Sequence, residues 1–123
     1  MNLTEERQAV ADLLTAGGIR AITHVPGKVT PPFAMTLPGS PYLSAAETFG
    51  GSKTFRLDVW LVEGVATGNA ALAEAMDARI AQTLSILEAD EWLVEDVQID
   101  QWEPSAGGKF PVAIIGIRTT ITP

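Results

Sequence analysis

The chain has 123 residues, of which 46% are hydrophobic and 19% charged, a composition typical of one globular domain spanning residues 1–123. Its formal net charge of −7, without a basic stripe, argues against a nucleic-acid-binding protein. The absence of cysteine excludes disulfides, thiolate zinc sites and cysteine nucleophiles. The first residues predict no secretory signal, and no apolar run reaches the ~18 residues of a membrane span, so we expect a soluble protein with no membrane partner.

The first predicted element is a helix over Leu3–Ala16. Asn2 and Glu5 have the spacing of a capping pair, in which the side chain of each residue accepts a hydrogen bond from the backbone N–H of the other. An apolar stripe at helical spacing follows, and Gly17-Gly18 ends the helix. The stripe consists of Val10, Leu13 and Leu14.

Two strands are predicted next, over Ile19–Val25 and Phe33–Leu37. Pro32 and Pro38 bracket the second strand. Because proline cannot donate to a strand ladder, this strand should be short and lie at an edge or be bent at both ends. Residues 39–53 are then expected to form a long connection with a helical turn around residues 44–48. Loops of this length are usually functional or become ordered against a partner.

The clearest strand pattern is Thr54–Glu63, which alternates strictly. One face should be core and the other should meet water. Trp60 and Val62 are nevertheless apolar on the second face. The expected core face consists of Phe55, Leu57, Val59 and Leu61; the other face consists of Arg56, Asp58, Trp60 and Val62.

A second helix over Asn69–Glu88 and strands over Leu93–Trp102 and Phe110–Ile121 complete the pattern. The order α-β-β-β-α-β-β predicts an α+β fold, with a mostly antiparallel sheet of four or five strands and two helices packed on one face. The other face should then be uncovered, yet it carries apolar side chains, which usually marks a contact surface. These are Trp60, Val62, Ile114 and, as a weaker candidate, Trp102.

The residue types needed for catalysis are scarce. His24 is the only histidine and is interpreted as a structural strand residue, and no G-x-S-x-G elbow occurs. The segment FGGSKT at residues 49–54 resembles a phosphate loop but has the wrong spacing and precedes a strand. We therefore predict no enzyme, no cofactor and no metal site.

Acidic residues gather in one part of the chain. Residues 80–108 contain seven of the 15 acidic residues and no lysine or arginine. The simplest interpretation is a solvated face.

The pattern as a whole resembles a known family. The stretch VTPPFAMTLPGSPYL, the strand FRLDVWLVEG, an alanine-rich helix and the closing GGKFPVAIIGIRTTIT follow an amphipathic first helix. In element order and length this resembles the tail terminator, or tail completion, proteins of long-tailed bacteriophages, particularly those of actinobacterial hosts. The resemblance implies a ring, usually of six copies, that caps the tail tube in the neck of the virion and joins it to the head–tail connector after assembly in the host cytoplasm.

The resemblance also suggests roles for residues. Ring contacts join two different patches of the same chain, and aromatic residues are favoured anchors. An acidic lumen would let genomic DNA pass without binding. Predicted subunit-interface residues are Phe33, Tyr42, Phe49, Trp60, Val62 and Trp102, with core capping as the competing role of Phe49 and Trp102; predicted lumen or docking residues are Glu91, Glu95, Asp96 and Asp100.

Besides a stand-alone structural adaptor of cellular origin, which the sequence does not exclude, two other functions fit the same sequence. One is a different head–tail joining or head completion protein of the virion. The other is a small α+β enzyme or ligand-binding domain that dimerises through the open sheet face, which predicts a pocket with convergent polar groups.

Overall fold

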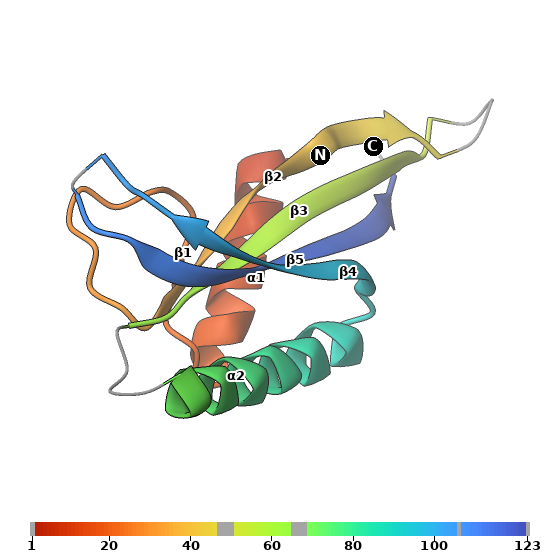
Figure 1. Ribbon diagram of the computed structural model, residues 1–123. Coiled ribbons are helices and arrows are strands. Elements are labelled where there is room, and N and C mark those ends of the chain that lie inside the picture. Colours follow the sequence, from red (N-terminus) through yellow and green to blue (C-terminus); the bar gives the residue numbers. More distant parts are fainter. Residues whose placement is uncertain (1, 47–50, 65–68, 106, 123) are drawn as a thin grey trace.

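A computed structural model describes residues 2–46, 51–64, 69–105 and 107–122 (Figure 1). The helices are α1 (Leu3–Ala16) and α2 (Asn69–Ala89). The strands are β1 (Ala21–Ile22), β2 (Phe33–Ala45), β3 (Lys53–Val62), β4 (Leu93–Trp102) and β5 (Phe110–Ile121). None of the helices in these ranges is long and apolar enough to cross a membrane.

The five strands form one sheet in the order β1-β2-β3-β5-β4. The short β1 runs parallel to β2, and the other three pairs are antiparallel. With two helices in the order α-β-β-β-α-β-β, this is the α+β fold predicted from the sequence, and that prediction is confirmed.

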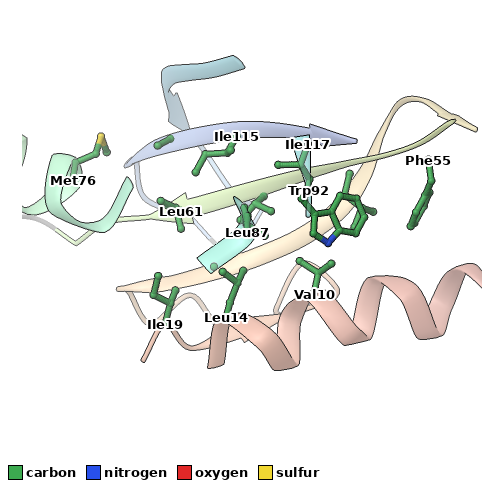
Figure 2. Packing of buried hydrophobic residues seen from close by; sticks show 14 residues of the cluster. Val10, Leu14, Ile19, Phe55, Leu61, Met76, Leu87, Trp92, Ile115 and Ile117 are labelled. Carbon is green, nitrogen blue, oxygen red and sulfur yellow. The ribbon is translucent and has the colours of Figure 1, made fainter. Parts of the chain in front are cut away.

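Both helices contribute to the hydrophobic core on one face of the sheet. Alternation along β3 and β5 directs one set of side chains to this face, and these side chains are fully buried. Figure 2 shows Val10 and Leu14 of α1 and Met76 and Leu87 of α2 in the same cluster as the strand residues. Burying each large apolar side chain stabilises the fold by roughly 1.5–3 kcal/mol. The strand residues are Phe55, Leu57, Val59, Leu61, Ala113, Ile115 and Ile117.

Polar contacts fix the two helices in place. The Asn2 side chain accepts a hydrogen bond from the Glu5 N–H at 3.1 Å, which confirms the predicted N-cap of α1. The Gln82 side chain of α2 donates to the Gly17 carbonyl at 2.8 Å, at the C-terminal end of α1. Arg79 of α2 pairs with Glu63, which directly follows β3 and is only 4% exposed. These contacts join α2 to both α1 and the sheet.

The prediction for the proline-rich segment is wrong. Instead of a strand ending at Leu37 and a loop over residues 39–53, β2 continues to Ala45 with an irregularity between Pro38 and Leu43. The Ala34 N–H donates to the Arg20 carbonyl beside β1, so by alternation the backbone of Pro38 faces the same side. Since β1 pairs only with Ala34 and Met35, that side is open at Pro38 and its missing N–H breaks no ladder bond.

The first predicted strand is also shorter than expected, because only Ala21 and Ile22 of residues 19–25 pair with a neighbour. The connection from β1 to β2 instead helps to cover the helix-free face of the sheet. There Val29 belongs to a second hydrophobic cluster with Phe33, Met35, Val62 and Val112. The expectation that this face is uncovered is therefore only partly correct.

Candidate assembly surfaces

On the helix-free face, three aromatic side chains from β3, β4 and β5 pack together with Ile114, and we call these four residues the aromatic group. Trp60 of β3 and Trp102 of β4 meet edge to face, with ring centroids 6.2 Å apart. Phe110 of β5 lies 6.4 Å beyond Trp102, and Ile114 pairs directly with Trp60 across the strands. All four are half-buried, and the prediction that Trp60 and Ile114 face away from the helices is confirmed. The aromatic group thus contributes to the fold and still presents part of its surface.

Other predicted interface residues lie elsewhere. Phe33 and Val62 are 2% and 0% exposed, so they belong to the chain's own second cluster and offer no surface to a neighbour. The reason is that the β1–β2 connection and the Trp102–Phe110 region pack over them. Tyr42 lies on the helix side, where its ring meets Phe55 edge to face at 5.2 Å. Phe49 lies outside the described residues.

Two carboxylates face one another across a glycine on the helix-free face. Asp58 of β3 and Asp96 of β4 both pair with Gly116 of β5, which lies between them. A Cβ on Gly116 would lie 2.7 Å from the Asp96 carboxylate, so glycine is needed for the carboxylate to fold over β5. Burial raises the pKa of Asp58 above its ordinary value, and the negative charges of Asp96 and Glu95 raise it further.

Arginine counters part of this negative charge. Arg56 donates from Nε to Glu95 at 3.1 Å and from Nη1 to Ser44 at 3.0 Å. Arg56 and Glu95, with Ser40 and the Asp58–Asp96 pair, line a hollow of about 170 Å³. Ligand pockets usually exceed about 300 Å³, so this hollow is small for one. No group of three metal-ligating side chains occurs in the part of the chain that the structure describes.

The other two predicted acidic residues stand apart. Asp100 accepts a hydrogen bond from the Gln101 N–H at 2.8 Å near the end of β4. Glu91 occupies the turn before β4 with a φ of 65° and lines an open hollow of about 480 Å³ together with Arg118. Three of the four acidic candidates therefore lie in β4, and Glu91 lies in the turn before it. His24, which was expected in a strand, lies in the exposed β1–β2 connection.

The edge strand β4 is the most exposed apolar element of the described chain. Val97 and Ile99 are 37% and 62% exposed, although both point to the helix side of the sheet. The strand contains no proline or lysine, so its protection from pairing with another chain is limited to three acidic residues and the irregularity between Val94 and Asp96. An open edge of this kind is a ready surface for another protein.

A groove continues this surface toward α2. It has a volume of about 280 Å³ and lies between the first half of α2 and the adjoining ends of β4 and β5. Most of its walls are apolar, and Asp77 contributes the one carboxylate. The lining residues are Leu72, Ala73, Met76, Asp77, Ile99 and Pro111.

Sequence reasoning identified Trp60, Trp102 and the acidic residues of β4, but it missed the apolar groove and the position of Asp58 opposite Asp96. The alternating pattern placed Asp58 on the helix-free face, but only the register of three strands brings it opposite Asp96. The exposure of Val97 and Ile99 depends on where α2 lies, which no local pattern reports. No protein-family model matches the sequence, and a search among curated proteins finds no match.

Proposed function

We propose that this chain is a structural protein of a bacteriophage virion, a tail terminator that forms a ring on the end of the tail tube. The observation that carries the proposal is the β4 edge, with its exposed Val97 and Ile99 and the apolar groove beside it. A ten-residue edge strand with exposed apolar side chains is an aggregation hazard in a free protein and useful in an assembled one.

The order of elements supports the same proposal. The family resemblance rests on the succession α-β-β-β-α-β-β, and the fold has this succession. The half-buried Trp60 and Trp102 supply a second surface, on the other face of the sheet. A subunit that contacts two copies of itself, the tail tube and the head–tail connector needs several such surfaces.

The charge of the chain suits a channel for DNA. With a net charge of −7 per copy, a ring would repel phosphate groups and let the genome pass without binding it. Asp96 and Asp100 are candidates to line the lumen, because they project from the exposed edge strand and form no ion pair with any described residue. This role places the protein in the neck of the virion.

The proposal is tested by native mass spectrometry and negative-stain imaging of the purified chain, alone and mixed with purified tail tubes. Closed rings, or rings bound to one end of each tube, are the expected result. A stable monomer that leaves the tubes unaltered and retains a small molecule would overturn it. Imaging of labelled virions that places the chain on the head side of the connector would favour the head completion alternative instead.

A further inference from the structure

Charge is divided between the two halves of the sheet. Residues 13–46, which include the end of α1, β1, β2 and the connection between these strands, contain no acidic residue. Residues 80–108, which include β4, contain no basic residue. In the strand order β1 and β4 are the first and last strands. One margin of the sheet is therefore built from a segment without carboxylates and the other from a segment without cations, although Arg56 of β3 reaches Glu95 of β4.

The basic margin presents one exposed apolar side chain. Val25, in the β1–β2 connection, is 52% exposed and lies between His24 and Lys28 in the sequence. Arg20 braces this connection, because its guanidinium donates to the Thr30 carbonyl at 2.6 Å and to the Thr30 hydroxyl at 3.1 Å. The connection is therefore held at its base, and Lys28 forms no ion pair with any described residue.

The acidic margin has the opposite features. The Glu63 N–H donates to the Pro111 carbonyl at 3.0 Å, so the backbone of Pro111 faces β3. Gln101 is the β4 residue opposite Pro111, so its own N–H and C=O face away from β5. By alternation, Ile99 and Val97 also direct their backbone polar groups to the open edge. This margin offers hydrogen-bond partners, exposed apolar side chains and, at Asp77, a carboxylate.

We propose that the groove and open edge of β4 in one copy receive the residue 20–28 segment of the next copy, with Val25 entering the groove beside Ile99 and Lys28 close to Asp77. The inference rests on the proposed ring and names the two surfaces that join its subunits. Opposite charges at the two surfaces favour this contact and give it one direction.

Charge also argues against a symmetric contact through β4. If two copies paired their β4 strands antiparallel, Glu95, Asp96 and Asp100 of one copy would meet the same residues of the other. Like charges directly opposite one another destabilise a strand pair. A head-to-tail contact avoids this and, repeated with a constant rotation, closes a ring.

The natural chain has no cysteine, so introduced cysteines report the contact directly. Val25→Cys and Ile99→Cys are prepared separately, mixed and oxidised. The expected product is a covalent dimer that forms in the mixture and not in either variant alone. Ala9→Cys, exposed on α1, replaces Val25→Cys in a control mixture that should cross-link several-fold more slowly. A chain carrying both Val25→Cys and Ile99→Cys should give a ladder of oligomers.

Each alternative gives a different result. Dimers of Ile99→Cys alone would overturn the inference in favour of a symmetric contact. An internal disulfide in the doubly substituted chain would overturn it by placing the segment on its own β4. Rings that form without the cross-link would overturn the proposed contact and leave the proposed function standing. Cross-linked oligomers that never close into rings would support the contact and count against the ring. Failure both to assemble and to cross-link at the limit of solubility would also overturn it.

Charge reversal provides an independent measurement. Lys28→Glu and Asp77→Lys should each reduce cross-linking between Val25→Cys and Ile99→Cys several-fold. Both reversals in one chain should restore it, because the charges are opposite again. Added salt should slow the reaction of the original pair, since exposed charges are screened. Equal rates for all combinations would overturn the assignment of Lys28 to Asp77.

Discussion

Replacing Gly39 with alanine tests the close approach of β2 to β3. A Cβ at this position would lie 2.8 Å from the Arg56 Cβ and 2.9 Å from the Arg56 carbonyl carbon and oxygen. Two of these three atoms are backbone, so the clash cannot be relieved by rotating a side chain. β3 would have to move away from the irregular part of β2, and Arg56 would lose its position between Ser44 and Glu95.

Overpacking of this kind typically costs about 1–3 kcal/mol in the free energy of unfolding. For a domain of this size, 1 kcal/mol corresponds to a shift of about 3–5 °C in Tm. We therefore expect Gly39→Ala to lower Tm by about 3–15 °C in a thermal melt followed by circular dichroism. Urea unfolding should give the same order of loss without a large change in slope.

Gly27→Ala is the matched control. A Cβ on Gly27 meets no atom within 4 Å, so this substitution should change the free energy of unfolding by no more than about 0.5 kcal/mol. If Gly39→Ala and Gly27→Ala unfold at the same temperature, β2 does not lie against the backbone of Arg56. The description of the acidic hollow would then be wrong as well.

Three further predictions concern other parts of the chain. Asp58→Asn should stabilise the protein at pH 7, because the raised pKa of Asp58 means that the fold disfavours the ionised carboxylate. The difference in the free energy of unfolding between variant and natural chain, measured in urea, should disappear as the pH falls below about 3.9, the pKa of an aspartate in the unfolded chain. A difference that persists in acid would contradict this. Arg79→Met should cost about 3 kcal/mol, the low end for a broken buried pair because Arg79 is itself 25% exposed, since it leaves the carboxylate of Glu63 buried without a partner. Adding Glu63→Gln should recover much of the loss in the same urea assay. Ile99→Asp should leave Tm nearly unchanged and weaken self-association measured by analytical ultracentrifugation, whereas Ile115→Asp should unfold the chain; unfolding of both would mean that Ile99 is core.

The elements that the sequence predicted well are those defined by their own pattern. The bounds of α1, β4 and β5 agree with the predicted ranges, and α2 and β3 differ by one residue at their ends. In each case the apolar period and a cap or turn residue lie within the element itself. Local chemistry was sufficient to locate them.

The errors arose where a neighbour decides the outcome. Pro38 was expected to end a strand, but proline interrupts a ladder only on the side where a partner needs its N–H, and β1 does not reach that far. Phe33 and Val62 were expected at a surface, but the Val29 and Trp102 regions pack over them. The Asp58–Gly116–Asp96 row requires the register of three strands, which alternation within each strand leaves open.

The outward-facing backbone of Pro38 in β2 has a consequence for copies that are crowded together during synthesis. Amyloid-like growth requires each strand to offer a complete row of donors and acceptors to the next. Pro38 interrupts that row on one margin, while β4 on the other margin contains no proline. A second copy can therefore pair with the backbone of β4, but the outer margin of β2 lacks a donor and cannot continue the ladder into a third copy. Repeated strand addition, and with it an amyloid-like ribbon, is blocked on the β2 side.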